Sequence, residues 1–329
     1  MYDLWKYCTS EHCRQLLISL NLFNGLHVSE EGQIACLYRL SRHPEQHYQE
    51  IRIPKKGGGF RILQAPDSLL KTVQRNILRH FLAEQAISPW ATAYQKGSSP
   101  GQNARIHTGA PLIIKLDIKD FFPNITFPMV YQRAFSSRLL PPAAGMLLAS
   151  LCCLRERLPQ GSPASPYISN LVMRPFDDYM GGWCRRQDIR YSRYCDDITF
   201  SGDFDSQAVF RKAGGFLHAM GFQLNREKTR IIPAGRRQTV TGAVVNRKAQ
   251  ADRAYRRRPR QEIYFCRKYG IEAHLAACGD TAGPRAYLQS LLGRIQWVLS
   301  LTPEDPEFIG YRDQVKEWLS ALRFFPPDA

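Results

Sequence analysis

The sequence lacks the features that define several classes of protein. Its nine cysteines contain no CxxC pair and no Cys/His array with metal-ligand spacing, which argues against a zinc site and a disulfide framework. No apolar run approaches the roughly 20 residues that a membrane-spanning helix needs. Residues 1–6 also lack the basic-then-apolar order of a signal peptide. We therefore expect a soluble protein of the reducing cytoplasm, with no membrane partner.

Acidic residues are scarce relative to basic ones. Asp and Glu number 29 against 45 Lys and Arg, which gives a formal charge of +16. This excess favours a polyanionic partner, and with 11% aromatic residues it favours nucleic acid over a membrane surface. A merely basic soluble protein stays open on charge alone. The 329 residues are enough for a substantial core in one large domain or two to three smaller ones.

Two adjacent carboxylates, Asp196 and Asp197, stand at the tip of a hairpin predicted from residues 189–194 and 198–201. Neighbouring side chains of a strand point to opposite faces, so both can serve one site only where a turn breaks the alternation. A solvated turn is the alternative, because Asp is common in turns. Asp117 favours the functional interpretation, since it ends another apolar run. Three carboxylates presented in this way suit two-metal phosphoryl transfer with Mg²⁺.

A basic hairpin is predicted upstream, from residues 48–53 and 60–64 joined through a glycine cluster. Lys55, Lys56 and Arg61 give it positive charge that could bind a triphosphate or a nucleic-acid backbone. A solvated basic turn explains the same residues.

Apolar spacing predicts most of the remaining chain as helix. The predicted helices cover residues 11–22, 30–41, 67–83, 143–154, a stretch from 167, 206–220, 256–269, 284–301 and 307–322. Ser29 is the expected N-cap of the second of them. Residues 93–102 are predicted as a loop and 111–116 as a strand ending at Asp117. The order of elements favours an α+β fold, with an antiparallel sheet and helices on one face.

Four segments in order carry a resemblance to the reverse transcriptases over about residues 50–246. They are Asp117 with Phe121-Phe122, Gln160-Gly161-Ser162-Pro163, Tyr194-Cys195-Asp196-Asp197 and Asn225-Arg226-Glu227-Lys228. The resemblance implies an RNA-directed DNA polymerase with fingers, an antiparallel-sheet palm and a helical thumb. We assign residues 1–110 to N-terminal helices and fingers, 111–246 mainly to the palm and 247–329 to the thumb.

Two further segments resemble the signatures of retron reverse transcriptases. Asn103-Ala104-Arg105-Ile106-His107 matches Asn-Ala-x-x-His, and Val240-Thr241-Gly242 matches Val-Thr-Gly. The resemblance implies an enzyme that copies its cognate msr-msd type noncoding RNA into single-stranded DNA joined to RNA by a 2′-5′ branch. It also implies dNTP substrates, antiphage defence and a separate effector protein.

The resemblance assigns roles to individual residues. Asp117 and Asp196 would bridge two Mg²⁺ ions, for which Mn²⁺ is a possible substitute, with Asp197 a weaker or orienting ligand. Lys228 would act as a general acid towards pyrophosphate, or would only steer phosphate. The expected nucleotide-binding residues are Lys55, Arg61, Phe122 as a gate against the 2′-hydroxyl, Gln160 and Gly161. The expected RNA-binding residues are Asn103, His107, Val240, Thr241, Gly242, Arg256, Arg257 and Arg258.

One departure from the family pattern is Cys195, where alanine is commoner. We expect the geometry to survive and the thiol to make the site more sensitive to oxidation. Two other functions stay open: another bacterial reverse transcriptase, of the group II intron or diversity-generating type, and a catalytically silent RNA-binding scaffold.

Overall fold

The computed structural model describes residues 4–54, 58–279 and 283–322. It divides into two compact units. Unit 1 comprises Met1–Ser98, Ile114–Phe200 and Phe204–Ile231, and unit 2 comprises Ser99–Ile113, Ser201–Asp203 and Ile232–Ala329. Helices and antiparallel strands occur in both, so the predicted α+β class is confirmed.

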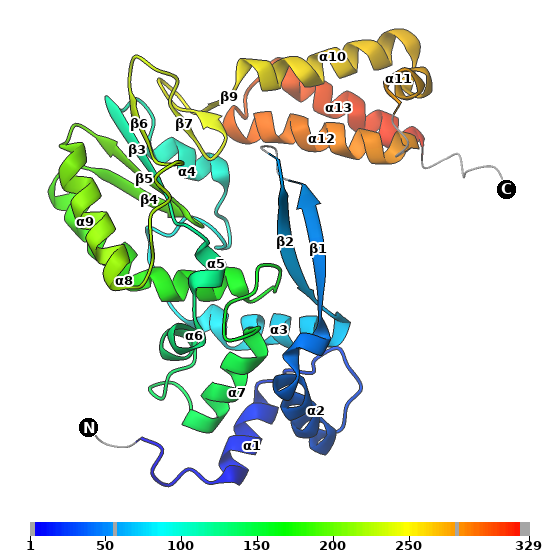
Figure 1. Ribbon diagram of the computed structural model, residues 1–329. Helices are drawn as coiled ribbons and strands as arrows, with labels where there is room; N and C mark the ends of the chain where they lie inside the picture. Colours follow the sequence, from blue (N-terminus) through cyan, green and yellow to red (C-terminus); the bar gives the residue numbers. More distant parts are fainter. Residues whose placement is uncertain (1–3, 55–57, 280–282, 323–329) are drawn as a thin grey trace. The chain divides into compact units, whose positions relative to one another are not determined.

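Unit 1 holds most of the helices and the principal sheet (Figure 1). Its helices are α1 (Ser10–Ser19), α2 (Glu30–Arg42), α3 (Ser68–His80), α5 (Phe121–Asn124), α6 (Phe127–Ala134), α7 (Pro142–Cys152), α8 (Ser165–Arg186) and α9 (Ser206–Ala219), with 3-10 turns at Pro44–His47 and Leu82–Glu84. Its strands are β1 (Tyr48–Pro54), β2 (Phe60–Pro66), β3 (Leu112–Asp117), β4 (Arg190–Tyr194), β5 (Asp197–Gly202) and β6 (Arg230–Pro233), some of which extend a few residues beyond the unit. The principal sheet has the strand order β4-β5-β3-β6.

The ends of α2 and α3 follow from side-chain capping. Ser29 caps α2 by accepting a hydrogen bond from an amide of the first turn, as the sequence predicts. Asp67 caps α3 in the same way, with 2.8 Å between its Oδ1 and the amide nitrogen of Leu70. Both caps satisfy amides that a helix N-terminus leaves unpaired.

Helix α8 lies against the principal sheet (Figure 1), and aromatic side chains pack between them. The rings of Phe176 and Tyr191 lie edge to face with centroids 6.4 Å apart, and Tyr191 also contacts Phe200 at 5.1 Å. Gly181 lets α8 approach Trp90, because a Cβ atom at position 181 would lie 2.1 Å from the indole ring. These contacts fix the strands that lead into and out of the aspartate-bearing turn.

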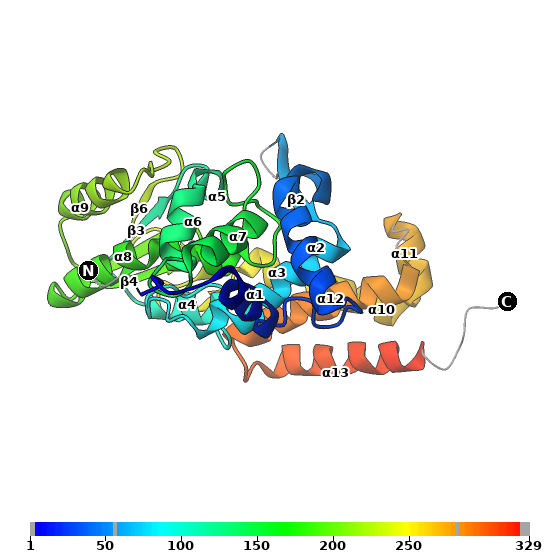
Figure 2. The same cartoon turned by 90° about the horizontal axis from the view of Figure 1, so that it is seen from below.

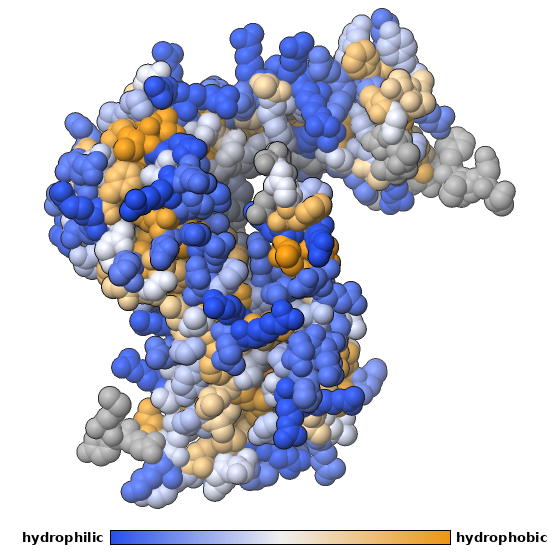
Figure 3. Space-filling model, viewed as in Figure 1, coloured by the Kyte–Doolittle hydropathy of each residue, from blue (hydrophilic) through white to orange (hydrophobic). Residues whose placement is uncertain are grey.

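The β1–β2 hairpin leaves apolar side chains exposed. Its antiparallel register pairs Ile53 with Arg61 and Arg52 with Ile62, which places Arg61 and Arg52 on opposite faces. Figure 3 shows an apolar patch over this hairpin. The exposed apolar residues are Ile51, Ile53, Phe60 and Ile62, each at least 43% exposed.

Unit 2 combines a three-stranded sheet with helices. Its elements are α4 (Pro100–Ile106), β7 (Thr239–Val240), β8 (Ala243–Val244), β9 (Gln250–Ala251), α10 (Arg253–Tyr269), α11 (Ile271–Cys278), α12 (Gly283–Leu301) and α13 (Pro306–Ala321). The helices α12 and α13 run side by side (Figure 2). The predicted loop over residues 93–102 is wrong at its end, because Ser99 caps a helix that starts at Pro100. The short helices α5, α6 and α11 were not predicted.

Among the described residues, no helix is both long enough and apolar enough to cross a membrane.

Candidate active site and nucleic-acid interface

The turn between β4 and β5 carries Asp196, whereas Asp197 is the first residue of β5 and does not lie in the turn as predicted. Only Cys195 and Asp196 separate the two strands, so the hairpin is tight. Cys195 has a φ of 62°, in the left-handed region that residues with side chains rarely occupy. The carbonyl oxygen of Asp196 accepts a hydrogen bond of 3.4 Å from the amide of Ile118, the residue after β3. Asp117 and Asp196, far apart in the sequence, are therefore brought to neighbouring backbone positions.

Asp117 is held from its other side by the segment that contains Lys228. The carbonyl oxygen of Asp117 accepts a hydrogen bond of 2.8 Å from the amide of Asn225. The Nζ atom of Lys228 lies 3.1 Å from each carboxylate oxygen of Asp117. The side chain of Lys228 is 62% exposed and that of Asp117 is 10% exposed, so the ammonium group covers a carboxylate that is otherwise nearly buried.

The charges of both other aspartates affect the pKa of Asp197. Burial is the main reason that its pKa is raised, and the charges of Asp196 and Asp117 raise it further. Lys115 and Lys228 oppose this effect on the pKa. The three carboxylates are thus close enough to repel one another. The positive charges of Lys115 and Lys228 reduce this repulsion.

The chemistry of these donors suits a divalent cation, whereas their arrangement is not a preformed site. Carboxylate oxygens are the ligands that Mg²⁺ prefers, and mutual repulsion of carboxylates is relieved by a bound cation. Within the described residues, however, no group of three or more His, Cys, Asp or Glu side chains is arranged to hold a metal ion. Lys228 occupies both oxygens of Asp117. A metal ion would have to compete with this ammonium group.

The segment Gln160-Gly161 lies against β2. The carbonyl oxygen of Gln160 accepts a hydrogen bond of 2.7 Å from the amide of Gln64. Gly161 has a φ of 136°, and a Cβ atom there would lie 2.6 Å from the carbonyl oxygen of Gln64. Only glycine permits both the conformation and the close approach. Residues 160–161 are therefore joined to the strand that also carries Arg61.

The other predicted nucleotide-binding residues differ in accessibility. Arg61 is exposed on β2, while Lys55 and Lys56 lie outside the described residues. Phe122 is 8% exposed and packs edge to face on Phe121, with centroids 5.4 Å apart. The ring of Phe122 thus belongs to the core of unit 1 and is only slightly accessible.

The surroundings of Cys195 disfavour the thiolate form of its side chain. Its Sγ atom accepts a hydrogen bond of 2.9 Å from the hydroxyl of Tyr94. Burial, with a further contribution from Asp196, raises the pKa of the Cys195 thiol to about 12. Since the thiolate is the form that oxidants attack, these surroundings oppose the expected sensitivity to oxidation.

The segment Asn103 to His107 forms the second half of α4 and its C-terminal end. Asn103 and His107 are 1% and 0% exposed. A hydrogen bond of 2.7 Å joins Nδ1 of His107 to Oγ of Ser201, the penultimate residue of β5. The side chains of this signature are therefore engaged inside unit 2.

The segment Val240 to Gly242 forms the turn between β7 and β8. Thr241 and Gly242 have φ values of 44° and 84°, as in a type I′ hairpin turn. Val240 is 1% exposed, whereas Gly242 lies at the surface. The hydroxyl of Thr241 donates a hydrogen bond of 2.6 Å to the carbonyl oxygen of Pro100, the first residue of α4. The two signature segments are thus joined to each other.

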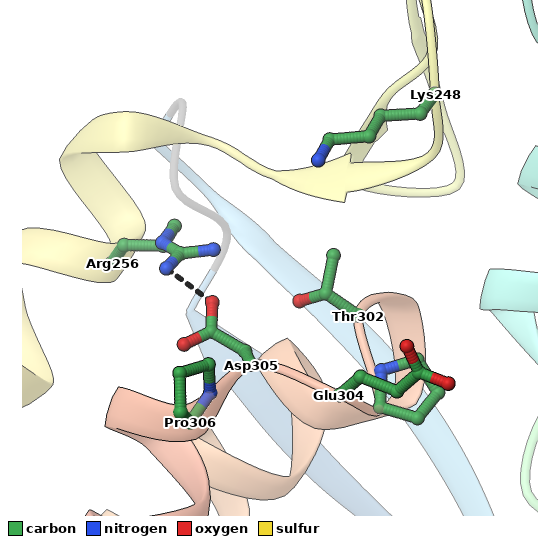
Figure 4. Close-up of a pocket in the computed structure, with 7 residues that line it drawn as sticks. Lys248, Arg256, Thr302, Glu304, Asp305 and Pro306 are labelled. Atoms are coloured by element: carbon green, nitrogen blue, oxygen red, sulfur yellow. Dashed lines mark hydrogen bonds and ion pairs between the residues drawn. The ribbon is translucent and has the colours of Figure 1, made fainter.

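The predicted RNA-binding arginines at the start of α10 have different partners. Arg256 lies over the ring of Phe308 and forms an ion pair of 2.5 Å with Asp305, on the wall of a pocket in unit 2 (Figure 4). Arg258 pairs with Glu262 at 3.0 Å and keeps 70% of its side chain exposed. Arg257 is exposed and has no ion-pair partner among the described residues. Of the three arginines, Arg256 is the one whose side chain packs inside unit 2.

Sequence reasoning missed several residues around the turn. Lys115 lies two positions before Asp117 on β3, so period-2 alternation could have placed it on the same face. The buried pair of Arg193 and Asp177 had no such signal, because the two residues come from a strand and a helix 16 positions apart. Tyr94 lies in a segment that was predicted only as a loop.

Comparison with known proteins gives consistent relatives. Residues 53–254 match the family "Reverse transcriptase (RNA-dependent DNA polymerase)". The retron Mx65 reverse transcriptase of Myxococcus xanthus is 35% identical over 293 residues, which cover 82% of this chain and 65% of that protein. The match thus spans slightly less than two thirds of the length of this relative. The retron Ec86 reverse transcriptase of Escherichia coli is 30% identical over 238 residues, which cover 70% of this chain and 73% of that protein.

Solved structures give a weaker likeness. A telomerase from Candida albicans, in complex with a fragment of telomeric RNA, superposes with a TM-score of 0.47 and 11% identity, covering 86% of this chain and 66% of that chain. The family match covers more than half of the chain, and the retron Ec86 relative is 30% identical with 73% of its own length covered. The chain carries a reverse transcriptase domain and belongs to the retron reverse transcriptases.

Proposed function

We propose that this protein copies its cognate msr-msd type RNA into single-stranded DNA that stays joined to RNA by a 2′-5′ branch. The observation that carries the proposal is the meeting of Asp117 with the Asp196-Asp197 turn, beside Lys228. Three interacting carboxylates with one exposed ammonium group suit nucleotidyl transfer from a dNTP. Membership of the retron reverse transcriptases supports synthesis of DNA on an RNA template.

In this proposal, Asp117 and Asp196 would hold two Mg²⁺ ions, with Asp197 a weaker or orienting ligand and Mn²⁺ a possible substitute. The ions supply activation of the attacking hydroxyl and stabilisation of the leaving oxygen. Lys228 would have to leave Asp117 for this carboxylate to serve as a metal ligand, and its ammonium group could then donate a proton to pyrophosphate. Burial of Asp117 keeps competing water away from the carboxylate.

The remaining predicted residues have supporting roles. Arg61, with Lys55 from outside the described residues, binds the triphosphate, and residues 160–161 hold β2 in place for it. Phe122, which is 8% exposed, acts as the gate against the 2′-hydroxyl of a ribonucleotide. Residues 1–110 form the fingers, 111–246 mainly the palm and 247–329 the thumb.

RNA recognition in this proposal uses the surface that the two signature segments build together. Gly242 and Arg257 are exposed, and Arg258 is largely exposed. The buried side chains of Asn103, His107 and Val240 lie beneath that surface and determine its shape. The complex works in the cytoplasm, in antiphage defence with a separate effector protein.

The test is to express the protein with its neighbouring noncoding DNA, purify the complex and analyse the bound nucleic acid. A discrete single-stranded DNA that separates from RNA on treatment with a 2′-5′ debranching enzyme is expected. Asp196→Asn should abolish it, while Asp203→Asn, an exposed aspartate beyond β5, should leave it intact. Unbranched or heterogeneous DNA would contradict the retron-type product, and DNA that persists in Asp196→Asn would contradict the assigned site.

A further inference from the structure

A fully buried ion pair lies directly behind the aspartate-bearing turn. Arg193 of β4 and Asp177 of α8 are both 0% exposed. The Nη2 atom of Arg193 lies 2.6 Å from Oδ2 of Asp177, and its Nε atom lies 2.9 Å from Oδ1. Burying two charges is costly unless further hydrogen bonds satisfy them, so the surroundings of such a pair are informative.

Polar residues of β4 and α8 form further hydrogen bonds with the two buried charged groups. Tyr191 donates its hydroxyl to Oδ1 of Asp177 at 2.7 Å. The Nη2 atom of Arg193 also donates to Oδ1 of Asn170 at 3.1 Å. A guanidinium group is planar and its donors form a rigid fork. Once Asp177 and Asn170 orient one side of the fork, the direction of the remaining Nη1 atom is fixed.

That Nη1 atom reaches the turn. It donates a hydrogen bond of 2.8 Å to the carbonyl oxygen of Cys195. The carbonyl belongs to the peptide group that links Cys195 to Asp196, so its direction sets the peptide plane from which Asp196 begins. Cys195 has a φ of 62°, a conformation that needs support from its surroundings.

The backbone of Arg193 is anchored as well. Its amide donates to the carbonyl oxygen of Trp90 at 2.9 Å, and its carbonyl oxygen accepts from the amide of Thr92 at 2.8 Å. The side chain therefore extends from a fixed point of β4 to the turn, with little freedom to follow a displaced carbonyl.

We propose that Arg193 is a positioning residue whose guanidinium group, oriented by Asp177, holds the Cys195 carbonyl and thereby the direction of Asp196. The expected effect of Arg193 on DNA synthesis rests on the proposed function above. The expected effect of Arg193 on the mobility of the turn is independent of that function.

The first variant is Arg193→Lys, which keeps the charge beside Asp177 but lacks the fork that reaches Cys195. The second is the triple variant Asp177→Leu, Arg193→Met, Tyr191→Phe, which replaces the buried polar groups by apolar ones of similar size, a change that proteins often tolerate. The control removes an exposed ion pair from the same helix, through Arg174→Gln with Asp178→Asn. Each protein is prepared as the full chain and its melting temperature is measured.

Two measurements separate positioning from stability. Hydrogen–deuterium exchange of the metal-free proteins reports the amides of residues 194–198, and we expect their exchange to rise by about tenfold in both variants, as loss of one hydrogen bond allows. Steady-state synthesis should show kcat lower by about 10²-fold, as expected for a misplaced reacting group, with a higher Mg²⁺ requirement and a KM for dNTP within about twofold. The control should match the wild type in both.

Unchanged exchange at the turn, or an unchanged kcat in a folded variant, would overturn the proposal and leave the pair a purely structural feature. Failure of both variants to fold would also overturn it, because the pair would then serve the fold as a whole. If the wild-type protein makes no DNA, the proposed function fails, and the exchange of residues 194–198 still decides whether Arg193 holds the turn.

Discussion

The ammonium group of Lys228 lies 3.1 Å from both carboxylate oxygens of Asp117. The protein thus neutralises its least accessible active-site carboxylate with a side chain that is itself 62% exposed. An exposed lysine can leave this position easily, because water solvates its charge. We therefore expect the pair to act as a reversible cover on Asp117.

Replacing Lys228 should affect metal binding and synthesis in opposite directions. In Lys228→Met, a divalent cation no longer competes with the ammonium group, so calorimetric titration should show tighter Mg²⁺ binding. DNA synthesis should nevertheless fall by about 10²-fold, as expected for loss of a general acid. Lys119→Met, which removes another exposed lysine near Asp117 in sequence, serves as the control.

The Lys228→Arg variant separates the two roles considered for this residue. A general acid needs a transferable proton, which a guanidinium group does not give up. The variant should therefore remain slow and lose the basic limb of the pH–rate profile. Synthesis at the wild-type rate with an unchanged profile would instead assign Lys228 to phosphate steering.

Asp197 should make the stability of the metal-free protein depend on pH. Its pKa is raised above the ordinary value of about 3.8, chiefly by burial. The folded protein then binds the proton more tightly than the unfolded protein, so stability falls as pH rises from that ordinary value through the raised pKa. Asp197→Asn should raise the melting temperature at pH 7, in EDTA, by on the order of a few degrees.

The gain from Asp197→Asn should shrink as the pH is lowered from 7 towards 4, because the raised pKa favours the protonated, neutral carboxyl group of the wild type at lower pH. A gain that stays constant between pH 7 and pH 4 would contradict an electrostatic origin. Added Mg²⁺ should stabilise the wild type more than the variant, because the variant lacks one carboxylate.

The two exposed arginines of the β1–β2 hairpin form a matched pair for testing nucleotide binding. Arg61 and Arg52 lie on opposite faces, as the pairing of Ile53 with Arg61 and of Arg52 with Ile62 requires. Arg61→Ala should raise the KM for dNTP by about tenfold or more, since a hydrogen bond between charged groups contributes about 1.5–3 kcal/mol. Arg52→Ala should change the KM little, and equal effects of the two variants would show that only the total charge of the hairpin matters.

The contact between His107 and Ser201 should contribute to stability rather than directly to RNA affinity. His107 is fully buried, and its Nδ1 atom lies 2.7 Å from Oγ of Ser201. His107→Ala and Ser201→Ala should each lower the free energy of unfolding by about 1–3 kcal/mol, with a coupling of about 1 kcal/mol in the double variant. Chemical denaturation measures both quantities.

RNA binding by the folded His107→Ala protein should stay within about twofold of the wild type, because one buried side chain lost beneath the surface costs well under 1.4 kcal/mol of binding. Filter binding with the cognate RNA, at a temperature where the variant is fully folded, provides the measurement. A large loss of affinity under those conditions would show that the imidazole reaches RNA directly.

Local patterns in the sequence determined much of the fold. Apolar spacing placed α3, α9, α12 and α13 to within a few residues, since a buried helical face requires that spacing. Ser29 marked the start of α2 through capping, which depends on only three neighbouring residues. The short helix α11 was missed, and the start of α4 was mistaken for a loop, because both contain few periodic apolar positions.

The sequence by itself determined the α+β class, the family, Asp117 at the end of a strand and Asp196 in a hairpin turn, because motif order and hydrophobic period are properties of the chain. Only the tertiary structure decided which groups face these residues. It placed Lys228 on Asp117 and Arg193 on the Cys195 carbonyl, and it buried His107 against Ser201. Such contacts join segments between 2 and 111 positions apart. They follow from how the elements pack, a relationship that neighbouring residues in the sequence do not specify.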